Sequence, residues 1–102
     1  MTEIEGFIRR LPKAELHLHL EGTITPATLK DLSARHDEQP MSLEEAEAYY
    51  RFGDFTGFIE AFKAVTRRLI DPEDYELAAW RMMEGLAAQG VVHAEVYISV
   101  GV

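Results

Sequence analysis

The chain has 102 residues, of which 47% are apolar and 27% charged, a composition typical of a folded domain rather than a disordered segment. Eighteen acidic and ten basic residues give a net charge of −8, which argues against nucleic acid or an anionic membrane surface as the main partner. The absence of cysteine excludes disulfides and thiolate zinc sites, and the absence of an apolar run of about 20 residues predicts a cytoplasmic protein without a membrane span.

The first fifth of the chain predicts a helix followed by a strand. Apolar residues at helical spacing indicate a short helix over residues 2–10, and Pro12 ends it. Over residues 14–20 the period changes, because aliphatic side chains alternate with a glutamate and with His17 and His19. This alternation is typical of a strand with one aliphatic and one polar face.

Four helices are predicted between this strand and the end of the chain. The expected ranges are 25–36, 42–50, 54–69 and 71–89. Their starts are marked, in this order, by a Thr-Pro pair, a Ser-Leu-Glu-Glu capping box, a Gly-Asp break and an Asp-Pro pair. The third range carries a continuous stripe of apolar side chains. Gly90 lies where a left-handed residue is expected to end the last helix.

Residues 91–99 predict a second strand, because they are rich in β-branched and aromatic side chains. Two strands separated by helices pair in parallel through a right-handed crossover. Two parallel strands do not form a self-sufficient sheet, since parallel sheets are normally covered on both faces. We therefore predict an α/β fold in which residues 1–102 are the incomplete N-terminal part of a single larger domain.

The polar face of the first strand carries the clearest chemical signal. Strand residues two apart project to the same face, so His17 and His19 present two imidazoles side by side, and Glu21 follows them. Two neutral imidazoles can occupy two positions around Zn²⁺. Such a pair also arises by chance on a half-exposed strand. Its place near the C-terminal end of the first parallel strand favours a site, because active sites of (β/α)₈ barrels gather at that end.

The segment from Leu11 to Thr23, with its His-x-His-x-Glu-Gly block, resembles the opening motif of the adenosine deaminase family in the metal-dependent amidohydrolase superfamily. Residues 54–62 are similar to the family's helix after the first strand, and residues 90–99 are similar to its second strand. The resemblance therefore spans nearly the whole chain. It implies the N-terminal portion of a (β/α)₈ barrel that hydrolyses the exocyclic amine of an adenine-type ring.

Residue by residue, the resemblance implies that His17 and His19 are zinc ligands. Glu21 takes a position where adenosine deaminases usually carry an aspartate that hydrogen-bonds the ribose side of the substrate. Gly22 would allow a ligand to approach the backbone closely. The remaining residues implied to form the substrate site are Phe55, Phe58, Ile59, Phe62 and Ser99. Plainer alternatives stay open, since the aromatic stripe can be ordinary helix packing and Glu21 an ordinary loop carboxylate.

The expected function is zinc-dependent deamination of an adenine-type nucleoside, with this chain carrying only the first half of the site. The family draws its other ligands and its catalytic residues from later strands, so we expect no catalytic residue within the chain and no activity from the chain alone. With glutamate at position 21, the motif resembles that of adenine deaminases and aminodeoxyfutalosine deaminases. Adenine and aminodeoxyfutalosine therefore both remain possible substrates. The alternatives are a non-catalytic fragment or binding module, and an amidohydrolase acting on an amide or lactone.

Overall fold

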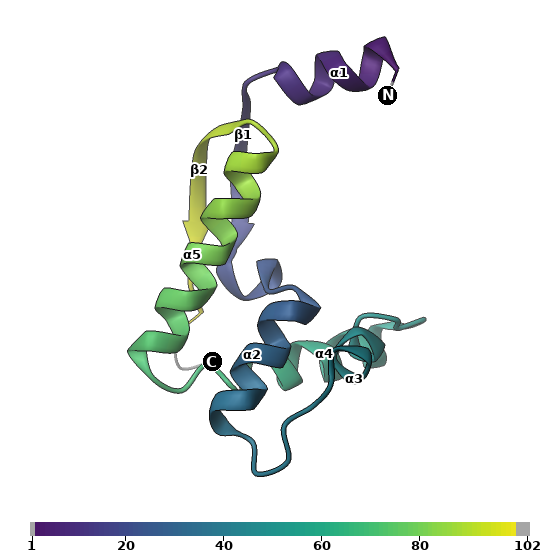
Figure 1. Cartoon of the computed structure of the whole chain (residues 1–102), viewed down its shortest axis with the longest axis vertical. Coiled ribbons are helices and arrows are strands. Elements are labelled where there is room, and N and C mark those ends of the chain that lie inside the picture. Colours follow the sequence, from purple (N-terminus) through teal and green to yellow (C-terminus); the bar gives the residue numbers. More distant parts are fainter. Residues whose placement is uncertain (1, 100–102) are drawn as a thin grey trace.

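The computed structural model describes residues 2–99, which form two parallel strands with helices between and around them (Figure 1). In chain order the elements are α1 (Glu3–Arg10), β1 (Lys13–His19), the 3₁₀ helix η1 (Leu20–Thr23), α2 (Pro26–His36), α3 (Leu43–Tyr49), α4 (Phe55–Thr66), α5 (Pro72–Ala88) and β2 (Val91–Tyr97). The predicted order of elements is confirmed. No helix among residues 2–99 has the length and apolarity that crossing a membrane requires.

The two strands pair in parallel, with Lys13 opposite Val91 at one end and His19 opposite Tyr97 at the other. Register shifts lie between Lys13 and Ala14 and between Glu15 and Leu18, and the second interval contains His17. Helix α5 lies along the strand pair, while α2, α3 and α4 gather beyond the ends at which both strands stop (Figure 1). This is the carboxyl end of the sheet, where α/β folds place their ligands.

Local signals explain where most elements begin. Capping boxes start α1 at Thr2 and α3 at Ser42, because each side-chain hydroxyl accepts from the backbone and a glutamate three residues later reaches back. Gly90 ends α5 with a φ of +76°, as predicted for a left-handed residue. Three predicted ends were too long, since β1 stops at His19, β2 at Tyr97 and α4 at Thr66.

The hydrophobic core lies at the carboxyl end of the strands, between η1 and the helices α2 to α5, and not on the sheet. Its fully buried members include Leu20, Leu29 and Leu32. By contrast, Leu16 of β1 is 62% exposed and Val92 of β2 is 77% exposed. The core therefore fixes the loop after β1, whereas parts of the strand pair beyond the cover of α5 remain exposed.

Candidate metal and substrate site

The two predicted metal ligands, His17 and His19, lie on one face at the end of β1 with their rings turned toward each other. Their Nε2 atoms are 3.0 Å apart, and both side chains are exposed. Zn–N bonds of about 2.0–2.1 Å in tetrahedral geometry separate two nitrogens by about 3.3 Å. Two lone pairs facing each other at this distance repel unless a proton or a cation lies between them. The donor set therefore fits a zinc ion with little movement of either ring.

Glu21 lies in η1, directly after the histidines, and it is only 4% exposed. Its Oε2 accepts a hydrogen bond of 2.8 Å from the backbone N–H of Ser99, which joins the ends of the two strands. Its Oε1 has no hydrogen-bond partner among residues 2–99. A buried carboxylate oxygen without a donor is costly, and such an atom calls for a specific explanation. The interpretation of Glu21 as a solvated loop carboxylate is therefore wrong.

A small cavity of about 60 Å³ lies beside Glu21 and Gly22 and has aromatic walls from Tyr50, Phe52 and Phe62. Of the predicted aromatic stripe, Phe62 therefore reaches the site. A Cβ added at Gly22 would meet only ordinary contact, at 3.9 Å from the Cβ of His19, so the fold itself does not require glycine there.

The outer part of the aromatic stripe is not core. Phe55 is 73% exposed and Phe58 is 43% exposed, and neither lines the cavity. Their rings continue outward from Phe62 instead, with centroids 6.5 Å apart between Phe58 and Phe62 and 6.1 Å between Phe55 and Phe58. Ile59 is half-buried and also lies outside the cavity lining. The part of α4 that is buried consists of Ala61, Ala64 and Val65.

Sequence reasoning missed the aliphatic members of the cavity wall and two of its aromatic residues, Tyr50 and Phe52. The two aromatic residues lie between α3 and α4, where no helical or strand period reveals which side chains turn inward. The Tyr50 hydroxyl donates to the carbonyl of Ile24, and burial raises the pKa of Tyr50 to about 12. Two aromatic residues in the short connection just before the predicted aromatic helix are the signal that could have identified this wall.

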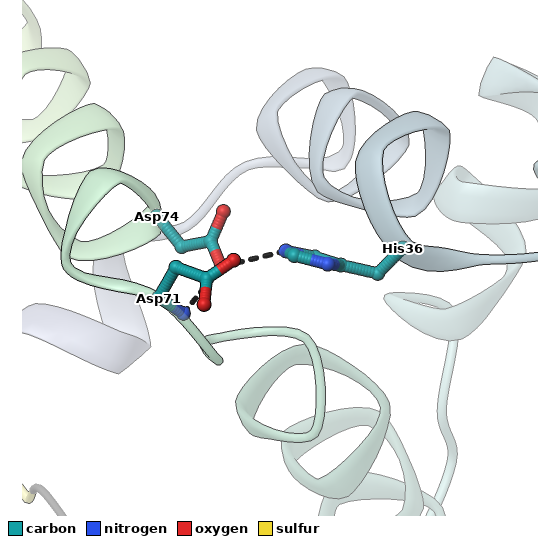
Figure 2. Close-up of side chains that lie close together, drawn as sticks. All are labelled: His36, Asp71 and Asp74. Atoms are coloured by element: carbon teal, nitrogen blue, oxygen red, sulfur yellow. Dashed lines mark hydrogen bonds and ion pairs between the residues drawn. The ribbon is translucent and has the colours of Figure 1, made fainter.

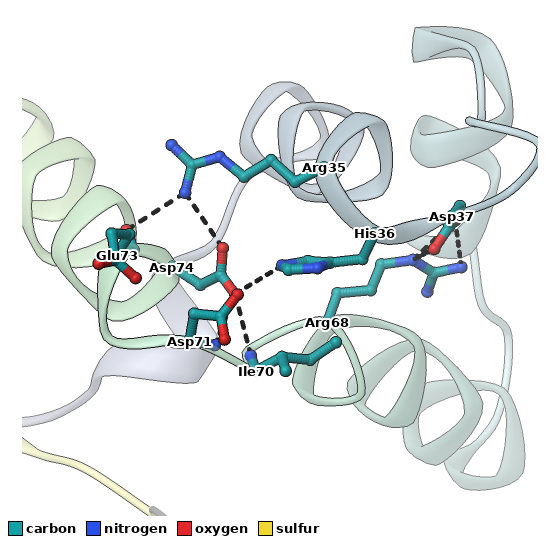
Figure 3. Close-up of polar contacts among 8 residues, drawn as sticks. All are labelled: Arg35, His36, Asp37, Arg68, Ile70, Asp71, Glu73 and Asp74. Atoms are coloured by element: carbon teal, nitrogen blue, oxygen red, sulfur yellow. Dashed lines mark hydrogen bonds and ion pairs between the residues drawn. The ribbon is translucent and has the colours of Figure 1, made fainter.

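A second group of potential ligands, His36, Asp71 and Asp74, lies between α2 and the start of α5 (Figure 2). The Asp74 carboxylate is 1% exposed. Its Oδ2 accepts from the His36 ring at 2.6 Å and from two backbone N–H groups, and its Oδ1 accepts from Arg35 at 3.1 Å (Figure 3). A carboxylate offers about four lone-pair positions, and four donors point at this one. With the Arg35 cation also present, this group fits a structural role better than a metal site.

Burial raises the pKa of Asp74, but hydrogen bonds outweigh this effect and lower the pKa to about 2; the donors are the backbone of Asp71 and Ile70 and the side chains of Arg35 and His36. The neighbouring Asp37 accepts from Arg68 at 2.9 to 3.1 Å, and these bonds lower the pKa of Asp37 as well (Figure 3). The two carboxylates therefore attach α2 to α5 and to α4. This network holds the helices that support the cavity.

Comparison with known proteins agrees with the fold and identifies the family. The family model described as adenosine deaminase matches residues 12–101. The adenine deaminase of Chlorobium luteolum is 38% identical over 95% of this chain and 29% of its own length. The aminodeoxyfutalosine deaminase of Streptomyces avermitilis is 36% identical over 95% of this chain and 28% of its own length. The crystal structure of adenine deaminase from Arthrobacter aurescens matches with a TM-score of 0.75 and 36% identity, over 85% of this chain and 27% of that one.

The fold thus defines an α/β unit that corresponds to the N-terminal part of a (β/α)₈-barrel enzyme, as the sequence predicted. The chain belongs to the adenosine deaminase family. It spans less than a third of the length of the relatives named above.

Proposed function

We propose that this chain supplies the first two metal ligands and part of the substrate pocket of a zinc-dependent deaminase that acts on an adenine-type base or nucleoside. The observation that carries the proposal is the convergence of the His17 and His19 Nε2 atoms at 3.0 Å, at the carboxyl end of β1. The family match and the names of the deaminase relatives support it.

The residues of this chain have distinct roles in the proposed reaction. His17 and His19 would hold the ion as neutral imidazoles, which leaves the other coordination positions to groups outside residues 1–102. When bound, zinc activates water for attack on the ring carbon that carries the amine. The catalytic acid and base are expected outside this chain, so the chain by itself is proposed to be inactive.

Glu21 and the cavity beside it are proposed to orient the substrate. The unpartnered Oε1 is an acceptor held in place by the Ser99 hydrogen bond, and it would accept an N–H or O–H group of the ligand. Gly22 leaves the backbone accessible, while Phe62 and its neighbours offer a flat apolar wall to the ring. Phe55, Phe58 and Ile59 would take part only at the outer rim, because they lie outside the cavity lining.

The test is an ammonia-release assay on the protein expressed from its complete gene, with adenine, adenosine and aminodeoxyfutalosine as substrates and a simple amide and a lactone as controls. Turnover of one purine, lost on chelation and restored by Zn²⁺, is expected. Glu21→Gln should raise KM or lower kcat/KM, since the amide places an N–H₂ where an acceptor is needed, whereas Asp31→Asn on the exposed side of α2 should change neither. Turnover of only the amide or lactone would contradict the proposal, as would the absence of all turnover in metal-loaded protein.

A further inference from the structure

Tyr97, the last residue of β2, packs against both proposed metal ligands. It lies opposite His19 in the parallel register. Its ring centroid is 4.8 Å from that of His17, with the planes at 65°, and 5.6 Å from that of His19, with the planes at 33°. The two imidazoles and the phenol therefore form one three-ring cluster across the strand pair.

This packing matters because both histidines are exposed, and the strand has a register shift in the interval from Glu15 to Leu18, which contains His17. An exposed imidazole can turn about two side-chain bonds, and metal binding must fix both rings in one converging arrangement. Edge-to-face and tilted aromatic pairs are worth about two- to tenfold each in an equilibrium constant. A ring that contacts both imidazoles therefore favours the converging arrangement before an ion arrives.

We propose that Tyr97 is a positioning residue whose aromatic ring holds His17 and His19 in the geometry that binds the metal. The role belongs to the ring and not to the hydroxyl, because the contacts are ring to ring. This inference rests on the proposed metal site. Neighbouring polar groups on the same strand do not compete for the cluster, since His93 and Glu95 pair with each other at 3.2 Å.

The test is the Zn²⁺ affinity of the protein from its complete gene, measured by competition with a chromophoric chelator. Tyr97→Phe keeps the ring and should bind Zn²⁺ within about twofold of the unaltered protein. Tyr97→Leu removes both ring contacts and should weaken binding about tenfold or more. His93→Ala, on the same strand, is the matched control and should leave the affinity unchanged, because its partner is Glu95.

Two results would overturn the inference: Tyr97→Leu binding Zn²⁺ as tightly as the unaltered protein, or Tyr97→Phe binding as weakly as Tyr97→Leu. Thermal unfolding in chelator shows whether Tyr97→Leu is folded. Should it not fold, nuclear Overhauser contacts between the rings of Tyr97 and His17 in the unaltered protein decide, and their absence overturns the inference. Failure of the metal site itself is distinguishable, since His17→Ala would then retain full Zn²⁺ affinity.

Discussion

Replacing Asp74 by asparagine tests how the helices around the cavity are held together. The carboxylate is 1% exposed, and its pKa lies at about 2, below the ordinary value of 3.8. A difference of this size corresponds to roughly 2 kcal/mol of stability at neutral pH. Asparagine loses the charge and also turns an N–H₂ group toward a donor such as Arg35, which adds about 1 kcal/mol or more. We expect Asp74→Asn to lower the free energy of unfolding by about 2–4 kcal/mol.

The sign of the pH dependence follows from the lowered pKa. The folded chain keeps the carboxylate of Asp74 ionised more strongly than the unfolded chain does. Its contribution is therefore complete above about pH 4 and is lost as the pH falls toward 2. The difference in free energy of unfolding between the unaltered protein and Asp74→Asn should therefore be about 1 kcal/mol smaller at pH 3 than at pH 7.

The assay is urea unfolding followed by circular dichroism at pH 7 and pH 3. Asp31→Asn is the matched control, because it removes an ion pair with Arg81 that is about 40% exposed on both sides and should cost below about 1 kcal/mol. Equal stability of Asp74→Asn and the unaltered protein at pH 7 would refute the reasoning. A stability decrease on chelation in a variant that lacks both His17 and His19 would show instead that the group around Asp74 binds a metal.

Three further substitutions probe the local devices that shape the fold, each by thermal unfolding. Gly90→Ala should cost about 1–2 kcal/mol, because φ is +76° and the new Cβ would lie 3.1 Å from the carbonyl oxygen of Arg9; an unchanged Tm would contradict this. Gly85→Ala, inside α5 with open space around it, should instead raise stability by about 0.5–1 kcal/mol. Asp54→Ala removes the cap that accepts from the Gly57 N–H at 2.8 Å and should cost about 1 kcal/mol, whereas a neutral effect would show that α4 does not depend on its cap.

The elements of this fold could be predicted because their signals are local. A hydroxyl or carboxylate before a helix, a proline in its first turn and a glycine after its last turn act within a few residues, as at Ser42, Pro72 and Gly90. The alternation that placed His17 and His19 on one face is equally local. The ends of strands and helices were predicted less accurately. For example, β1 is followed directly by the 3₁₀ helix η1, for which the sequence carries no clear local signal.

The depth of side chains and the long-range pairs could not be predicted. Periodicity predicts which apolar residues of α4 share one face of the helix. Only tertiary contacts determine that Phe62 reaches the cavity while Phe55 stays exposed. The Glu21 contact with Ser99 joins residues 78 apart in sequence. His36 and Asp74 likewise come from two different helices, and their contact forms only once α2 lies against α5.

The most direct test of the central claim is the zinc content of the protein from its complete gene, compared with that of a variant carrying His17→Ala and His19→Ala together. Elemental analysis should find zinc in the unaltered protein and a loss of nearly all of it, with loss of purine deamination, in the variant. The His93→Ala control should keep both. A double variant that retains full zinc content and full turnover would contradict the claim that the imidazole pair of β1 holds the metal.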